Sequence, residues 1–168
     1  MKKQILEFDR EYRFLSNFWP ATINIDGAEY PTVEHYYQAM KSDNPSIQDT
    51  IRNLSGPGKA KRYGKQVTLR GDWEKIKMGI MEKGIKAKFE QHPELMRKLI
   101  ELKDYELIEG NNWGDDFWGV TLDNMIGDNF LGKLLMKIRD ENLPKETETK
   151  DPNREISWLP IHQHGVLK

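Results

Sequence analysis

A row of polar side chains follows a helix start near residue 32. Thr32 is a favourable N-cap, because its side-chain oxygen can accept a hydrogen bond from a free N–H of the first turn. With that cap, Glu34, Gln38 and Lys41 recur at helical spacing and share one face. A carboxylate, an amide and an amine in one row can serve as acid or base, orienting group, and cation or nucleophile. A structural interpretation is also open, in which Glu34 and Lys41 only complement the helix dipole.

A second group of candidate residues lies in the segment 110–127, which is rich in Gly, Asn and Asp and predicts a long loop. Loops of this length inside a domain are commonly functional. We therefore expect the segment to form one wall of a site. Its candidate residues are Trp113, Asp115, Asp116, Phe117 and Trp118. The two aspartates could instead only shape turns, as Asp commonly does.

Carboxylates combined with aromatic rings suit the cleavage of a bond between ribose and nitrogen. The transition state resembles an oxocarbenium ion, so a carboxylate can stabilise its charge or activate water. Aromatic faces can hold the departing base, at about 1 to 3 kcal/mol per stacked base. Trp113 and Trp118 lie among polar loop residues and favour this role. Trp73 starts an amphipathic helix and fits core packing equally well.

Other classes of site have little support. The chain has no cysteine, which excludes thiol catalysis and cysteine-rich zinc sites. The histidines are scattered and lack the spacing of a metal site: His35, His92, His162 and His164. No nucleophile elbow surrounds a serine, and Gly56-x-Gly58-Lys59 lacks the rest of a phosphate-binding loop. We therefore expect no metal site.

The elements that must position these residues are mainly helices, preceded by a little β-structure. Residues 4–8 predict a short strand, and residues 23–30 predict a hairpin around Asp26-Gly27. Helices are expected over residues 32–41, 45–54, 73–89, 93–102 and 129–142, with Asn44 and Asp72 as further N-caps and Leu131, Leu134, Leu135 and Ile138 as the buried face of the last one. The turn-rich residues 55–58 end the second helix, and residues 107–108 form an extended or short helical connection.

Composition places the chain among single-domain proteins. Its 168 residues, 37% of them hydrophobic, suffice for one core without disulfides. A net charge of -1 gives no broad basic surface for nucleic acid, and no segment has the length or polarity of a membrane span or a signal peptide. We expect a cytoplasmic protein with no membrane partner. The domain is expected to span residues 1–144, and residues 145–168 form a C-terminal extension with a charged linker and an apolar segment.

Several motifs in this order together resemble the NADAR (YbiA-like) family. They are Phe14-Leu15-Ser16-Asn17-Phe18, Tyr30-Pro31-Thr32-Val33-Glu34-His35 with Gln38-Ala39-x-Lys41, Gly71-Asp72-Trp73, Lys88-Phe89-x-Gln91, Trp113-Gly114-Asp115-x-Phe117-Trp118-Gly119 and Asn129-x-Leu131-Gly132-x-x-Leu135-Met136-x-x-Arg139. The resemblance covers residues of about 6 to 142.

The resemblance implies a mainly α-helical fold with a small β-hairpin or short strands, and hydrolysis of N-glycosidic bonds without a metal or organic cofactor. Family members act on phosphoribosylamino-pyrimidine intermediates of riboflavin biosynthesis and so limit damage from these reactive compounds. Other members remove ADP-ribose from guanine bases, so ADP-ribosylated nucleic acid or nucleotide is the alternative substrate. A non-enzymatic ADP-ribose or nucleotide sensor is a second alternative.

The resemblance also assigns roles to single residues. Glu34 and Asp115 match the acidic positions of the family, and Trp73 and Trp118 match its aromatic positions. Asn17, Phe18 and Asn129 match its pocket-lining motifs. Gln38 and Trp113 complete the predicted substrate-binding set.

Lys41 matches the helix lysine of the family. The resemblance implies one of two roles for it, the amine that forms a Schiff base with a ring-opened sugar or a clamp for phosphate. One departure concerns phosphate recognition, because Lys65 follows Gly64 where the family often has Gly-Arg. A second is that the segment after Pro144 lies outside the shared pattern.

Overall fold

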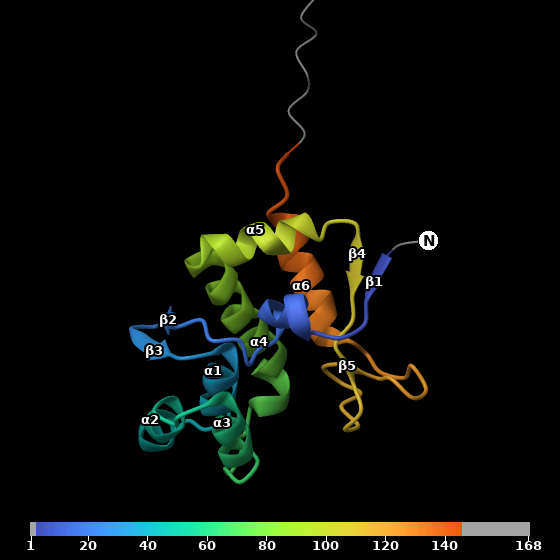
Figure 1. The fold of residues 1–168 in the computed structure, drawn as a ribbon. Helices are drawn as coiled ribbons and strands as arrows, with labels where there is room; N and C mark the ends of the chain where they lie inside the picture. Colours follow the sequence, from blue (N-terminus) through green and yellow to red (C-terminus); the bar gives the residue numbers. More distant parts are fainter. Residues whose placement is uncertain (1–2, 146–168) are drawn as a thin grey trace, which may run out of the picture.

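Helix α4 (Trp73–Gln91) is the axis of the fold. Helices α1 (Val33–Ala39), α5 (Pro93–Glu101) and α6 (Phe130–Glu141) and strand β2 (Ile23–Ile25) all contact it (Figure 1). This computed structural model describes residues 3–145. The remaining elements are β1 (Lys3–Ile5), the 3-10 helix η1 (Arg10–Leu15), β3 (Ala28–Tyr30), α2 (Pro45–Arg52), α3 (Pro57–Gly64), β4 (Tyr105–Leu107), β5 (Gly110–Asn111) and β6 (Val120–Thr121). The mainly α-helical class expected from the sequence is confirmed.

The core forms where the apolar faces of the helices meet around α4. Burial of these side chains is the main favourable term in folding. The face predicted for the last helix is confirmed, since Leu131, Leu134, Leu135 and Ile138 are all buried. Among the described residues, no helix combines the length and apolar character needed to cross a membrane. The predicted boundary at residue 144 stays a prediction, because residues 146–168 lie outside the described part.

The hairpin predicted around Asp26-Gly27 is confirmed, with β2 and β3 antiparallel. Asp26 and Gly27 have φ angles of 51° and 83°, the two left-handed residues that a tight hairpin turn requires. The prediction for residues 4–8 is wrong in its bounds, because β1 covers Lys3–Ile5 and pairs in parallel with β4. The segment 110–127 is also not one continuous loop, since it contains the parallel pair β5 and β6.

Local capping explains where two of the helices start. Thr32 and Asn44 each accept a hydrogen bond from a backbone N–H of the first turn, as predicted for α1 and α2. Asp72 precedes α4, but its side chain makes no cap hydrogen bond. Its carboxylate instead pairs with Arg70, with 2.6 Å between Nε and Oδ1. The predicted Asp72 cap is therefore wrong in its chemistry, although the helix starts as expected.

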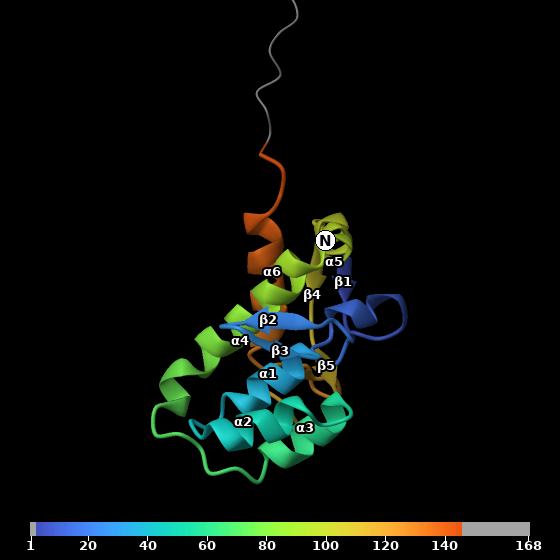
Figure 2. The same cartoon turned by 90° about the vertical axis from the view of Figure 1, so that its left-hand side faces the viewer.

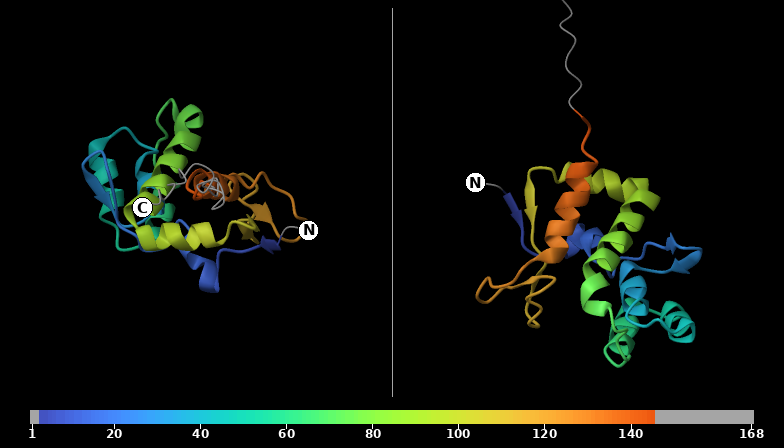
Figure 3. Two further views of the ribbon diagram at one scale, coloured as in Figure 1. Left: turned by 90° about the horizontal axis from the view of Figure 1, so that it is seen from above. Right: turned by 180° about the vertical axis from the view of Figure 1, so that it is seen from behind.

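Helix α3 was not expected from the sequence. Residues 55–58 predict a helix end, yet Pro57 occupies the first position of a new helix, where its fixed φ angle and missing N–H are tolerated. Helices α1, α2 and α3 pack against one another (Figure 2). Helices α2 and α3 and the segment 110–127 all lie at the end of the molecule opposite α5 (Figure 3).

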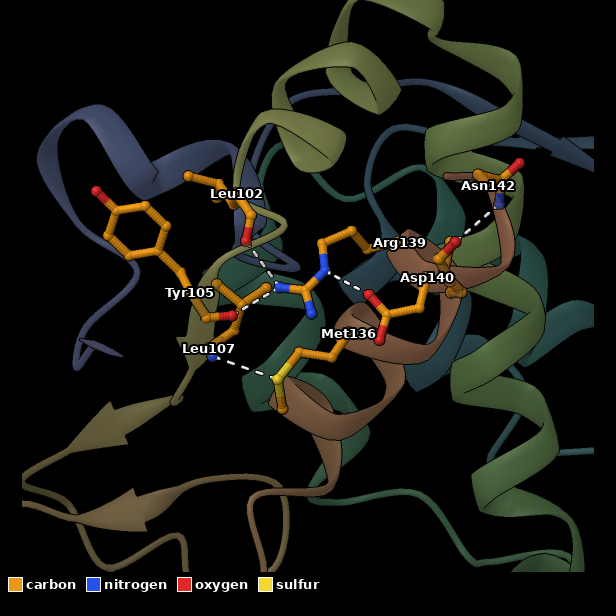
Figure 4. A network of polar contacts seen from close by, with 8 residues as sticks. Leu102, Tyr105, Leu107, Met136, Arg139, Asp140 and Asn142 are labelled. Carbon is orange, nitrogen blue, oxygen red and sulfur yellow. Dashed lines mark hydrogen bonds and ion pairs between the residues drawn. The ribbon is translucent and has the colours of Figure 1, made fainter. Parts of the chain in front are cut away.

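A buried arginine ties α6 to the chain between α5 and β4. Arg139 Nη1 donates to the carbonyl oxygens of Leu102 and Tyr105 at 2.8 and 2.7 Å (Figure 4). Its Nε pairs with Asp140 at 2.8 Å. Because a buried guanidinium needs such partners, this contact fixes the start of β4 against α6. Strand β4 leads directly into the candidate site.

Candidate active site

A cavity of about 670 Å³ opens between α1, α3, the chain around residue 17 and the segment 109–118. This volume falls in the usual range for small-ligand sites. The lining residues are Phe8, Arg13, Ser16, Asn17, Phe18, Trp19, Glu34, Tyr37, Gln38, Lys41, Gly58, Lys61, Arg62, Lys65, Met81, Glu109, Trp113, Asp115, Trp118 and Leu131. Most of the predicted site residues therefore share one cavity, including Glu34 and Asp115, which come from distant parts of the sequence.

Helix α1 supplies the polar row of the cavity. All of its residues are buried, so it can hold Glu34 and Gln38 against solvent. Gln38 Nε2 donates to Glu34 Oε1 at 2.7 Å, and the backbone N–H of Glu34 donates to the carbonyl of Asn17 at 3.1 Å. Lys41 lies just beyond the helix end but reaches the same cavity. The expected row of Glu34, Gln38 and Lys41 is present.

Glu34 is a buried carboxyl group with cations nearby. Burial raises its pKa, while the Gln38 hydrogen bond and the positive charges of Lys61 and Lys41 act in the opposite direction. The negative charge of Asp115 raises the pKa further. Such a group can hold a proton or, with the cations in place, stabilise a positive charge that develops on a sugar.

Lys41 is a half-buried amine. Burial lowers its pKa, Glu34 raises it, and the charges of Lys61 and Lys65 lower it. Its Nζ lies 5.6 Å from the centre of the Tyr37 ring. A lowered pKa makes more of the neutral amine available, which a nucleophile requires, and leaves a cation for phosphate below that pKa. The geometry is compatible with both predicted roles.

Asn111 organises the segment that carries Asp115. Its Oδ1 accepts the backbone N–H of Asp115 at 3.0 Å, and its Nδ2 donates to the Asp115 carbonyl at 2.7 Å. Asp115 Oδ1 in turn accepts the N–H of Trp118 at 2.9 Å. One carboxylate oxygen of Asp115 therefore shapes a turn, which is the structural role considered for it, while the residue also lines the cavity.

The aromatic residues divide into cavity walls and core. Trp118 lines the cavity, and its Nε1 donates to the hydroxyl of Tyr37 at 3.2 Å. Trp73 is buried in the core and packs behind Tyr37, with ring centres 5.1 Å apart. The structure therefore does not place Trp73 in the cavity wall. Its packing can support the position of Tyr37.

Two exposed aromatic rings flank a lysine at the cavity. Lys61 Nζ lies 5.8 Å from the centre of the Phe18 ring and 5.6 Å from that of Trp113. Trp113 is 63% exposed and Phe18 40% exposed. Large exposed aromatic surfaces beside a cavity commonly mark binding sites. The expected substrate-binding residues Phe18 and Trp113 are thus available to a planar ligand.

Basic side chains from α3 and its end line the cavity. They are Lys61, Arg62 and Lys65, joined by Arg13 from η1. Of these, only Lys65 was named from the sequence, as a departure from the family pattern, and the others were not singled out. Their positive charge offsets the acidic residues inside the cavity and suits an anionic ligand group. Helical spacing of Lys61 and Lys65 could have revealed this face if Pro57 had been taken as a helix start.

Asn129, predicted to line the pocket, does not lie among the lining residues. It precedes α6 with a left-handed φ of 53°. Its Oδ1 accepts the backbone N–H of Glu109 at 3.0 Å, and its Nδ2 donates to the carbonyl of Leu107 at 2.9 Å. Asn129 therefore holds the connection between β4 and β5. Glu109, which lines the cavity from this connection, was not singled out from the sequence.

Residues 5–142 match the NADAR domain family. The chain belongs to the NADAR family. A relative named N-glycosidase YbiA, from Shigella boydii serotype 4, is 40% identical over 135 residues, which cover 78% of this chain and 82% of the relative. A relative named Riboflavin biosynthesis protein VVA0006, from Vibrio vulnificus, is 36% identical over 80% of this chain and 37% of its own length. The NMR structure of E. coli YbiA matches with a TM-score of 0.74 and 36% identity over 82% of both chains.

The histidines and acidic residues of the described chain are not clustered as metal ligands. Within residues 3–145, no group of three or more His, Asp or Glu side chains is arranged to hold a metal ion. His35 and His92 use ring nitrogens in contacts with Thr32 and with the carbonyls of Leu54 and Thr22. His162 and His164 lie outside the described residues. The cavity instead combines acidic side chains, aromatic rings and a basic edge. This basic edge consists of Arg13, Lys61, Arg62 and Lys65.

Proposed function

We propose that this protein hydrolyses the bond between ribose and nitrogen in a phosphoribosylamino-pyrimidine intermediate of riboflavin biosynthesis. The broader activity, hydrolysis of an N-glycosidic bond, follows from NADAR membership and from relatives named N-glycosidase at about 40% identity over most of both chains. The pyrimidine intermediate is supported by a relative named for riboflavin biosynthesis. A cytoplasmic location stays a prediction.

The observation that carries the proposal is Glu34, a buried carboxyl group on the wall of an aromatic-lined cavity. In this proposal Glu34 stabilises the sugar cation and accepts a proton from the attacking water. Gln38 orients the carboxylate through its 2.7 Å hydrogen bond. Trp118, Trp113 and Phe18 provide faces for the heterocycle. Asp115 adds a second negative charge, in addition to its turn-shaping contact with Trp118.

The basic edge of the cavity supplies the site for the 5-phosphate of the ribose. Lys61 is half-buried between the Phe18 and Trp113 rings, and Arg62 and Lys65 are more exposed. Arginine and lysine both bind phosphate, arginine with two parallel hydrogen bonds and lysine as a point charge. Lys41 lies deeper, where it can contact phosphate or attack a ring-opened sugar as a nucleophile.

The alternative substrate is ADP-ribosylated guanine. The four basic residues Arg13, Lys61, Arg62 and Lys65 exceed what one phosphate monoester needs, which favours a diphosphate ligand. The second alternative is a sensor that binds ADP-ribose or a nucleotide without cleaving it. A buried acid with an orienting amide has no evident use in such a sensor and favours turnover.

A direct comparison of substrates tests the proposal. Purified protein is incubated in parallel with the aminopyrimidine ribotide and with ADP-ribosylated guanosine, and free base is followed by chromatography. We expect release of base from the ribotide. Cleavage of ADP-ribosylated guanosine alone would replace the first substrate by the second. Binding of ADP-ribose without any cleavage would identify a sensor.

The variant Glu34→Gln links the activity to the cavity. We expect kcat to fall by about 10²- to 10⁴-fold with a much smaller change in affinity, since the lost group acts mainly in the transition state. Glu29→Gln is the matched control, because Glu29 is exposed on β3 and does not line the cavity. Equal activity of both variants would remove Glu34 from the mechanism.

A further inference from the structure

Glu109 is a cavity residue with a rigidly held backbone. It lies between β4 and β5, its N–H donates to Asn129 Oδ1 at 3.0 Å, and its carbonyl accepts the N–H of Val120 at 2.9 Å. The backbone of Gly119 packs closely against this connection, since a Cβ on Gly119 would lie 2.2 Å from the Glu109 carbonyl oxygen. The backbone therefore fixes where the side chain enters the cavity.

Glu109 is half-buried, and one of its carboxyl oxygens is buried without a hydrogen-bond partner in the described part of the chain. This atom, Oε2, is inaccessible to solvent. A buried polar atom without a partner costs free energy, typically about 1 to 3 kcal/mol. Such atoms in native proteins are often functional. Because Glu109 lines the cavity, a rotation of its carboxyl group would bring this oxygen to a bound molecule, which could then supply the missing partner.

The surroundings of Glu109 favour its protonated form. Burial and the negative charges of Asp115 and Glu34 raise its pKa to about 7, and the positive charges of Lys61 and Lys88 only partly oppose this. Lys88 Nζ already donates to the carbonyls of Phe14 and Ser16, at 2.5 and 2.8 Å. Among residues 3–145, no donor reaches Glu109 Oε2 to offset its burial.

Glu34 differs from Glu109 in having a hydrogen-bond donor. Burial raises the pKa of Glu34 as well, but the hydrogen bond from Gln38 and the positive charges of Lys61 and Lys41 oppose this. Two acids in one cavity that interact are best treated as a pair sharing protons. Gln38 donates a hydrogen bond to Glu34, whereas Glu109 Oε2 has no donor within residues 3–145, so the hydrogen bonding favours the proton on Glu109 and the charge on Glu34. When one carboxyl group of a pair is protonated and the other is ionised, the two can act as acid and base at the same pH.

We propose that Glu109 is a catalytic residue, the general acid that protonates the nitrogen departing from ribose. The proposal rests on the function proposed above. As the bond between C1′ and nitrogen breaks, its electron pair stays on nitrogen, which takes the proton of the Glu109 carboxyl group. Water forms the new bond to C1′ and gives a proton to the Glu34 carboxylate. Exchange with solvent then returns the proton from Glu34 to Glu109, so one water is consumed per bond cleaved.

Two substrates with different leaving groups test this role. The aminopyrimidine ribotide needs a proton on its nitrogen, whereas 4-nitrophenyl ribofuranoside 5-phosphate loses a stable anion and needs none. We expect Glu109→Gln to lower kcat on the ribotide by about 10²- to 10⁴-fold, with a loss below about 10-fold on the nitrophenyl compound. Glu34→Gln should lose activity on both. Glu106→Gln is the matched control, because Glu106 on β4 bonds the exposed Gln4 outside the cavity.

The pH dependence gives an independent readout. Wild-type kcat on the ribotide should fall as the pH rises through about 7, because the acid form of Glu109 is lost. This alkaline limb should be absent from the remaining activity of Glu109→Gln. If Glu109→Gln does not fold, Glu109→Asp keeps the acid one methylene shorter, and its loss should again be greater on the ribotide.

The outcomes separate this proposal from the proposed function. Wild-type protein that cleaves no N-glycoside would overturn the function itself. Active wild-type protein with full ribotide activity in Glu109→Gln would overturn only the role of Glu109. An equal loss on both substrates would also overturn it, since a proton donor matters only where the leaving group needs a proton.

Discussion

Gly64→Ala tests whether the close contact between α3 and α1 positions the Glu34 carboxylate. Gly64 is the last residue of α3 and faces Gln38. A Cβ at this position would lie 1.9 Å from Gln38 Oε1, 2.7 Å from its Cδ and 3.0 Å from its Cβ. Gln38 holds Glu34 through a 2.7 Å hydrogen bond, so the added methyl group must displace the Gln38 amide that orients the Glu34 carboxylate.

The size of the effect follows from opposing terms. Overpacking of this kind costs about 1 to 3 kcal/mol. Alanine is a better helix former than glycine by up to about 1 kcal/mol, although less at a helix end. We therefore expect a net loss of about 1 to 2 kcal/mol in the free energy of unfolding, or roughly 2 to 8 °C in Tm for a chain of this size. Displacement of Glu34 by a few tenths of an ångström or more should lower kcat by about 10- to 100-fold.

Thermal unfolding and steady-state kinetics on the aminopyrimidine ribotide measure both effects. Gly79→Ala is the matched control, because Gly79 lies in the exposed face of α4 and an added Cβ meets no atom within 4 Å. That variant should gain about 0.5 to 1 kcal/mol in stability and keep its kcat. The comparison separates the intrinsic preference for alanine from the clash.

A double-mutant cycle with Gln38→Ala makes the test specific. Removing the Gln38 amide removes the closest atoms that the new Cβ would meet, so Gly64→Ala should cost much less kcat in that background. Wild-type kcat and Tm in Gly64→Ala would refute the reasoning. Additive losses in the double variant would also refute it, because they would place the effect outside this contact.

Further predictions concern stability and binding. Glu34→Gln should raise Tm near pH 7.5 while it lowers kcat, because a raised carboxyl pKa makes ionisation unfavourable to the native state above the unfolded pKa. Trp113→Ala should raise KM by about 5- to 150-fold with unchanged Tm, since its ring is 63% exposed and stacking is worth about 1 to 3 kcal/mol; an unchanged KM would exclude stacking on this ring. Burial lowers the pKa of Lys88 from 10.5 to about 7, so the unfolded chain holds the extra proton between these values and wild-type stability should rise from pH 7 to 9. Denaturant unfolding should show that Lys88→Met loses this rise, and a pH-independent wild type would contradict it.

Much of the fold follows from local chemistry that the sequence displays. The turn at Asp26-Gly27 and the cap at Thr32 depend only on neighbouring residues, and both occur where predicted. Helix α3 was missed because Gly and Pro around Pro57 indicate a helix end as readily as a helix start. The cavity cations that it carries, Lys61 and Arg62, were lost with it.

The site could be predicted in part. Glu34 and Asp115 were identified by their surroundings and by family motifs, and they line one cavity. Glu109 carried no signal, because no motif surrounds it between Ile108 and Gly110 and the charges that act on it come from other elements. Trp73 and Asn129 match family motifs, yet one packs behind Tyr37 and the other holds the backbone of Glu109. Sequence motifs do not distinguish residues that contact a ligand from those that support them.

The acidic and the basic side chains of the cavity come from different elements of the fold. Its acids come from α1 and the segment 109–118, whereas three of its five cations, Lys61, Arg62 and Lys65, come from α3 and the residue that follows it. Substituting these three side chains, with Gly64 kept, would alter which phosphorylated sugar is admitted while Gln38, Glu34 and Glu109 stay in place. A designer could thus direct this scaffold to new ribosides through Lys61, Arg62 and Lys65 alone.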